Sequence, residues 1–297
     1  MAKPHGRDED GTPIYFCIWC GSRESLTREH VLAKKWRKYF GSPDSPRVYS
    51  GWQLDLATMR PLRIDRTLPR QGAFTWTVPR LVCAPCNNGW MSQLEDAVEP
   101  ILLPAALGKV VALDEGQQGL VLKWLAKTAI VMEFMDQQPK SFDLQRLEWL
   151  QRHLGDGYIV PGFVGSISRL SVTTETNLRS SPFSQWRRSP LGRVEVVGTT
   201  RVASIQLGAV GLTTLYSSDT DMWSSTVTGT TMGMLEEGML TGSPYPVNLG
   251  DQVVLSRAQH QDRHTRVAAE VGRSLGVVDP ASPEVREAFG LPTASRT

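Results

Sequence analysis

Two cysteine pairs place the strongest constraint on how this chain can fold. Two residues separate Cys17 from Cys20 and Cys83 from Cys86, and 62 residues without another cysteine lie between the pairs. Such spacing lets both sulfurs of a tight turn face one ion, and two pairs complete the four-sulfur shell that structural zinc prefers. The pattern predicts one zinc ion that joins two distant stretches of chain; the alternative is four unrelated buried cysteines.

The expected compartment supports a metal site over disulfides. The first ten residues contain no apolar signal core, and the chain has no run of about 18 apolar residues, so we expect a cytoplasmic protein that does not span a membrane. In a reducing compartment, paired cysteines are typical of metal binding. A four-cysteine shell has no open coordination position, so this zinc would stabilise the fold and a catalytic ion would be a second one.

Basic side chains are concentrated in one segment. The whole chain carries a net charge of +2, but residues 23–80 hold twelve basic and five acidic residues, a net charge of +7. A basic segment in a nearly neutral protein is typical either of a polyanion-binding face or of a solvated surface. The best candidates for contact with a nucleic-acid backbone are Lys34, Lys35, Arg37 and Lys38. Nearby tryptophans, including Trp19 and Trp36, either pack in the core or stack on unpaired bases.

Periodicity and turn residues predict an α+β protein. Residues 26–31 are expected to form a strand, 32–40 a helical turn, and 41–80 an extended insertion that contains a hairpin. Helices are predicted over 87–102, 114–138 and 141–154, with Asn87 or Asn88 as the first cap and Pro104 after the last turn. Short strands are predicted over 158–160, 194–197, 201–207, 212–216 and 252–255, and residues 186–188 are expected in a surface loop.

This pattern divides the chain into three expected parts. Residues 1–104 form a zinc-stapled module, and 105–257 form an accessory region, helical and then rich in mixed or antiparallel strands. Residues 258–297 form a short helix and a flexible tail. No catalytic cluster is recognisable after residue 105, so this half is expected to carry target choice, a regulatory pocket, oligomer contacts or contacts with a partner protein.

Glu29 and His30 follow the first cysteine pair and are the leading catalytic candidates. Adjacent residues of a strand point to opposite faces, so both can serve one site only where the backbone is locally twisted. A carboxylate can bind a divalent cation beside a phosphate, while a neutral imidazole accepts a proton from water. Histidine suits the second role because its ordinary pKa of about 6.5 leaves it mostly neutral near pH 7.

Asn87 and Asn88 follow the second cysteine pair directly. An amide oxygen is a suitable ligand for Mg²⁺ or Mn²⁺, and a helix N-terminus favours a nearby phosphate. The alternative is that both residues only cap the helix. Glu95 lies two helical turns beyond Asn88; we expect it to be a solvated side chain on this helix, and the alternative is that it approaches the metal.

Together these motifs resemble the HNH endonucleases, the ββα-metal nucleases with a zinc-stapled active site. The matching residues are Cys17-x-x-Cys20, Leu26-Thr-x-Glu29-His30-Val31 and Cys83-x-x-Cys86-Asn87-Asn88-Gly-Trp-Met-Ser-x-Leu-Glu95, within about residues 14–100. The resemblance implies a DNA-cleaving hydrolase in which His30 is the general base and Glu29 and Asn87 bind the catalytic cation. It also implies Asn88 as a reserve ligand.

One family residue is missing. The middle Asn, about five residues before the second cysteine pair, helps to orient the histidine, and Val78 occupies its place here. This absence favours the rival hypothesis, a non-catalytic zinc module that binds nucleic acid or a partner protein. Among nucleic acids we favour DNA over RNA, because no feature of the chain indicates contact with a 2′-hydroxyl.

Overall fold

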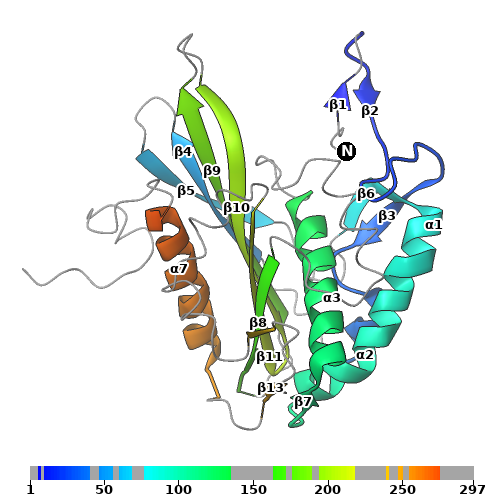
Figure 1. Ribbon diagram of the computed structural model, residues 1–297, viewed down its shortest axis with the longest axis vertical. Helices are drawn as coiled ribbons and strands as arrows, with labels where there is room; N and C mark the ends of the chain where they lie inside the picture. Colours follow the sequence, from blue (N-terminus) through cyan, green and yellow to red (C-terminus); the bar gives the residue numbers. More distant parts are fainter. Residues whose placement is uncertain are drawn as a thin grey trace, which may run out of the picture.

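The computed structural model describes residues 6–7, 10–40, 47–55, 60–68, 77–134, 163–171, 176–188, 194–217, 239–240, 247–249 and 254–274. The described chain is α+β, as predicted (Figure 1). Its helices are α1 (Ala84–Cys86), α2 (Ser92–Ala106), α3 (Glu115–Glu133) and α7 (Arg257–Ser274), with a 3₁₀ segment η1 (Lys34–Lys38) and a π-helical segment η3 (Asn87–Met91).

The largest sheet has five strands, all antiparallel, in the order β12-β8-β11-β10-β9. Its strands are β8 (Phe163–Arg169), β9 (Thr176–Arg188), β10 (Val194–Leu207), β11 (Val210–Ser217) and β12 (Met239–Leu240). The strands predicted near 194, 201 and 212 are confirmed as parts of β10 and β11. A two-residue turn joins β10 to β11, and Gly208 adopts a φ of 52° there, which suits a residue without a Cβ.

Helix α3 lies between the sheet and α2 (Figure 1). It begins with a capping box in which the Asp114 side chain accepts from the Gln117 backbone N–H and the Gln117 side chain accepts from the Asp114 N–H. Its residues from Val121 to Glu133 are all buried. A helix covered on every side needs no polar face, which explains why most of its residues around Trp124 and Ile130 are apolar, with Lys123 and Lys127 as buried exceptions.

The N-terminal part forms a second, smaller layer next to α2. Strand β3 (Leu26–His30) pairs antiparallel with β6 (Thr77–Cys83), and β6 leads directly into α1, η3 and α2. The insertion between them contains the predicted hairpin, β4 (Arg47–Asp55) with β5 (Arg60–Leu68). Four short strands of the described chain complete the list, paired as β1 (Gly6–Arg7) with β2 (Pro13–Ile14) and β7 (Ala112–Leu113) with β13 (Val247–Asn248).

Two predictions about the helix after the second cysteine pair are wrong. The helical path begins at Ala84, with Cys83 as its N-cap, so neither Asn87 nor Asn88 caps it. At the other end α2 continues through Pro104 to Ala106. A proline removes one N–H from a helix, and burial of Leu102, Ala105 and Ala106 in the core offsets that loss.

Several predictions lie outside the described residues, namely the helix over 141–154, the strand over 158–160 and the tail after Ser274. The helix predicted from residue 258 is confirmed, and its 18 residues lie against the five-stranded sheet. One apolar core runs from Cys17 through α2 and α3 to Leu249. None of the helices in the described part of the chain is long and apolar enough to cross a bilayer.

Candidate metal centre and active site

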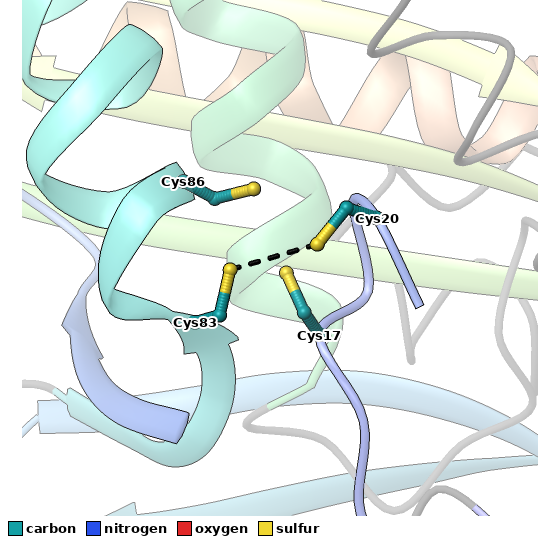
Figure 2. Close-up of side chains that lie close together, drawn as sticks. All are labelled: Cys17, Cys20, Cys83 and Cys86. Carbon is teal, nitrogen blue, oxygen red and sulfur yellow. Dashed lines mark hydrogen bonds between the residues drawn. The ribbon is translucent and has the colours of Figure 1, made fainter. Parts of the chain in front are cut away.

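The four cysteines form one cluster, as the spacing predicts. Their sulfur atoms all lie within 4.8 Å of one another, and they form the cluster of potential metal ligands found among the described residues. Cys17, Cys83 and Cys86 are buried, whereas Cys20 is exposed. Figure 2 shows the four side chains pointing toward a common point from the first loop, the end of β6 and α1.

Backbone hydrogen bonds hold both cysteine pairs in place. The first pair lies in a tight loop in which the Gly21 N–H donates to the Cys17 carbonyl at 2.8 Å, and Gly21 has a φ of 73°. This loop is attached to β6 because the Ile18 N–H donates to the Leu81 carbonyl at 3.1 Å. The two stretches of chain therefore meet through the strands as well as through the sulfur atoms.

The donor set fits a tetrahedral zinc ion. The Cys20 and Cys83 Sγ atoms lie 3.5 Å apart, far beyond the roughly 2.05 Å of a disulfide. Four sulfurs at about 2.3 Å from zinc would be roughly 3.8 Å apart, close to the observed separation. Burial raises the pKa of Cys17 to about 11, so the thiol is neutral near pH 7 unless a cation stabilises the thiolate. The cluster could thus hold a structural zinc, whose binding would release protons.

His30 is the last residue of β3 and is half-buried. Burial is the largest cause of its lowered pKa, followed by the positive charge of Lys34, and the carboxylate of Glu95 acts in the opposite direction. The imidazole is therefore neutral at pH 7 and can accept a proton. Val78 is buried and lies opposite Glu29 in the ladder, so the apolar side chain that replaces the family's middle Asn cannot hydrogen-bond an imidazole.

Glu29 is buried and forms an ion pair with a lysine from another helix. The Lys127 Nζ of α3 lies 3.3 Å from Glu29 Oε1 and 2.7 Å from Glu95 Oε1. Burial lowers the pKa of Lys127, but the carboxylates of Glu95 and Glu29 outweigh it and raise the pKa overall. Burial raises the pKa of Glu29 in spite of Lys127. The Glu29–Lys127–Glu95 triad is therefore a buried charge cluster directly behind His30.

The β3–β6 pairing is irregular next to this triad. The register shifts between Thr27 and Glu29, so that Arg28 on β3 faces three residues of β6. One of these, Arg80, adopts a φ of 56° in the left-handed region, which is uncommon for a residue other than glycine. Irregular pairings re-aim the side chains that follow them. The pairing is regular again from Glu29 to His30, opposite Val78 and Thr77, so these two adjacent side chains still point to opposite faces of β3. The irregularity therefore does not by itself bring Glu29 and His30 to one site.

Asn87 reaches back to the strand that ends in His30. Its Nδ2 donates to Thr27 Oγ1 at 3.0 Å and to the Arg28 carbonyl at 3.4 Å. These bonds use only the amide nitrogen, and the amide oxygen is the atom that can bind a cation. Asn87 begins the π-helical segment, within which Gly89 departs from helical geometry. Asn88 is exposed.

The four basic candidates of η1 differ in their surroundings. Lys34, Arg37 and Lys38 are exposed, whereas the Lys35 Nζ lies 2.5 Å from Asp96 and 2.6 Å from Glu99 on α2. Two tryptophans near this segment pack in the core: Trp36 stacks on Trp124 with ring centroids 5.4 Å apart, and Trp19 is fully buried. Lys35 therefore attaches η1 to α2, and the other three basic side chains are available to a polyanion.

Sequence reasoning missed the charge cluster behind His30. Lys127 was not recognised, and Glu95 was expected to be solvated, although it contacts the Lys127 ammonium at 2.7 Å. One signal was present: Lys127 lies in the middle of an apolar helix, where a charged side chain needs a partner. The identity of that partner, 98 residues away in sequence for Glu29, was not readable from any local pattern.

Comparison of the chain with protein-family models, with curated proteins and with solved structures finds no match.

Proposed function

We propose that this protein is an HNH-type endonuclease that hydrolyses DNA phosphodiester bonds with His30 as the general base. The observation that carries the proposal is a hydrogen bond from the Asn87 side chain to Thr27, on the strand that ends in His30. Asn87 and Thr27 are 60 residues apart in the sequence. The four-cysteine cluster lies at the base of the same two segments. The resemblance in motifs is thus supported by a contact between two of the matching segments, the strand that contains Glu29 and His30 and the helical segment that follows Cys86.

The proposed reaction uses groups of this chain for binding and proton transfer. Lys34, Arg37 and Lys38 are exposed next to His30 in sequence and would bind the phosphate backbone. His30, neutral at pH 7, would accept one proton from an attacking water molecule. The water oxygen would form a bond to phosphorus as the bond to the leaving oxygen breaks, and that oxygen would take a proton from solvent.

The cation predicted beside His30 fits only part of its expected ligand set. The amide oxygen of Asn87 is a suitable ligand, but a divalent cation at Glu29 would meet the Lys127 ammonium, which is 3.3 Å from the carboxylate. Glu29 could therefore bind the cation only after its ion pair with Lys127 is broken. Mg²⁺ or Mn²⁺, when bound, would neutralise charge on the scissile phosphate.

The second candidate function is a zinc-stabilised module that binds nucleic acid or a partner protein without cleavage. The specific observation in its favour is the same Glu29–Lys127 ion pair, together with Val78 in place of the middle Asn. In this case the Glu29–Lys127–Glu95 triad would only stabilise the fold, and the basic residues of η1 would supply the affinity.

A cleavage assay separates the two functions. Plasmid and single-stranded DNA would be incubated with Mg²⁺, with Mn²⁺ or with EDTA, using wild type, His30→Ala and the control His153→Ala. A nuclease loses about 10²- to 10⁴-fold in cleavage rate in His30→Ala while DNA affinity is unchanged, and His153→Ala keeps both. Absence of metal-dependent cleavage in wild type, with normal DNA binding, would sink the nuclease proposal and support the binding module.

A further inference from the structure

Helix α7 covers the face of the five-stranded sheet that is opposite to α3 (Figure 1). On the α3 side, the Tyr216 hydroxyl donates to the Ala129 carbonyl at 3.3 Å. On the α7 side, the Ser204 hydroxyl lies 2.8 Å from His264 Nδ1, and the Arg263 guanidinium donates to Ser168 Oγ. The second interface thus contains polar side chains beside the buried apolar residues Val267, Ala268 and Val271, whereas an interface of this kind is ordinarily apolar throughout.

The strand register gathers further polar residues under α7. Gln206 of β10 lies opposite Asn177 of β9, and Ser204 lies opposite Arg179. Directly opposed residues share one face of a sheet, so these four side chains face the same helix. Together with His260 and His264 they line a cavity of about 10 Å³. A cavity of this size accommodates one atom the size of a water oxygen.

Two buried side chains in this cavity have polar atoms that form no hydrogen bond with the described residues. His260 is 3% exposed and Gln206 is 2% exposed. Within the described part of the chain, neither ring nitrogen of His260 has a hydrogen-bond partner, and neither do the oxygen and the nitrogen of the Gln206 amide. Buried polar atoms in folded proteins are almost always hydrogen-bonded, so this cluster requires a partner that is not among the described residues.

The charges around the cavity favour an anionic partner. The charged groups that act on His260 are Arg263 and Arg179, and those that act on His264 are Arg179 and His260. No carboxylate of the described residues acts on either imidazole. On α7 itself Asp262 is exposed and forms an ion pair with Arg266 at 2.9 Å, and Glu270 is buried but does not line the cavity. A metal cation would meet two guanidinium groups here, whereas an anion would be attracted by them.

We propose that the cavity between α7 and strands β9 and β10 binds an oxyanion, of the phosphate or carboxylate class, with one oxygen placed among Arg179, Gln206 and His260. The guanidinium and the Gln206 amide N–H₂ donate to that oxygen, and His260 donates from one ring nitrogen. The remainder of the ligand lies outside the cavity, since there is room for only one of its atoms. The site is separate from the four-cysteine cluster and from His30.

Calorimetric titration of the full chain, with its zinc retained, tests the proposal. The probes are inorganic phosphate, adenosine 5′-monophosphate and acetate, at constant ionic strength. One site per chain is expected for at least one of these oxyanions, with affinity at least tenfold weaker in Arg179→Gln and in Gln206→Leu. The control Arg266→Gln removes an exposed arginine of α7 that does not line the cavity, and it should leave the affinity unchanged.

Three results of these titrations would overturn the proposal. Absence of binding by all three oxyanions overturns the proposal and assigns the cavity to a water molecule. An equal loss of affinity in Arg266→Gln also overturns it, because general charge attraction would then explain the binding. Saturable binding of Ni²⁺ that is lost in His260→Ala would assign the pair His260 and His264 to a metal instead. Urea unfolding of each variant confirms that it is folded before titration.

Discussion

Removal of the Lys127 ammonium is expected to destabilise this protein far more than removal of an exposed lysine. Lys127 has no exposed side-chain surface, and its partners Glu29 and Glu95 are 6% and 18% exposed. The variant Lys127→Met keeps a long apolar side chain but leaves the buried Glu29 carboxylate without a cation. Leaving one member of a buried ion pair uncompensated costs about 3–5 kcal/mol of unfolding free energy.

Lys35 provides the matched control. It also contacts two carboxylates, Asp96 and Glu99, but its side chain is 34% exposed and theirs are 67% and 24% exposed. Exposed ion pairs contribute about 0.2–1 kcal/mol each, so Lys35→Met should cost roughly 1 kcal/mol or less. Urea unfolding monitored by circular dichroism gives both free energies under the same conditions.

The pH dependence of this difference follows from Glu29. Burial already raises its pKa, and the loss of Lys127 removes an opposing influence, so the pKa rises further in Lys127→Met. A carboxyl group with a raised pKa in the folded state stabilises the fold at low pH, and the effect is lost as the pH rises through that pKa. The loss of unfolding free energy in Lys127→Met relative to wild type should therefore be larger at pH 8 than at pH 5. Adding Glu29→Gln to Lys127→Met should restore part of that loss. A deficit no larger than that of Lys35→Met would refute the reasoning.

Three further predictions concern α7, its sheet and the cysteine cluster. A Cβ at Gly211 would lie 2.6 Å from His260 Nδ1, so Gly211→Ala should lower the unfolding free energy by about 1–3 kcal/mol. In the control Gly116→Ala the nearest atom to the new Cβ is 3.5 Å away, and no such loss is expected. Equal unfolding free energies of the two variants in urea would contradict this prediction. Burial lowers the pKa of His260 to about 4 and of His264 to about 3, from 6.5. The stability that these neutral imidazoles contribute is complete above pH 6.5. It is lost as the pH falls toward 4, by up to ~1.4 kcal/mol of unfolding free energy per histidine and pH unit. Urea unfolding in anion-poor buffer at pH 7, 6 and 5 measures this loss, and an unfolding free energy that does not change with pH would contradict it. A strong zinc chelator should lower the melting temperature of the protein and change the fluorescence of the buried Trp19, and an unchanged melting curve after complete zinc removal would exclude a stabilising role for the ion.

The features that followed from chemistry and local periodicity were predictable. The cysteine pairs indicated one cluster because four soft ligands at this spacing have few other uses, and the sulfur atoms do converge. The helix α3 and the strands β10 and β11 were predicted from apolar periodicity. The Glu29–Lys127 contact was not, because it depends on how α3 packs against β3, and no local pattern encodes such a contact.

Strand β9 was missed for a physical reason. It contains Asn177, Arg179 and several serines, and residues 186–188 were expected in a surface loop, whereas they lie within the strand. The face of the sheet under α7 carries polar side chains, so β9 lacks the alternation of apolar and polar residues by which a strand is recognised. The residues that obscured the strand are the same ones that line the proposed oxyanion site.

The central claim is that one sulfur-ligated zinc ion joins the loop before β3 to the start of α1. X-ray absorption at the zinc edge, on protein purified without added metal, tests it most directly. We predict one zinc per chain with four sulfur ligands at about 2.3 Å. A folded protein without zinc, or a zinc shell in which nitrogen or oxygen replaces two or more sulfurs, would contradict the account.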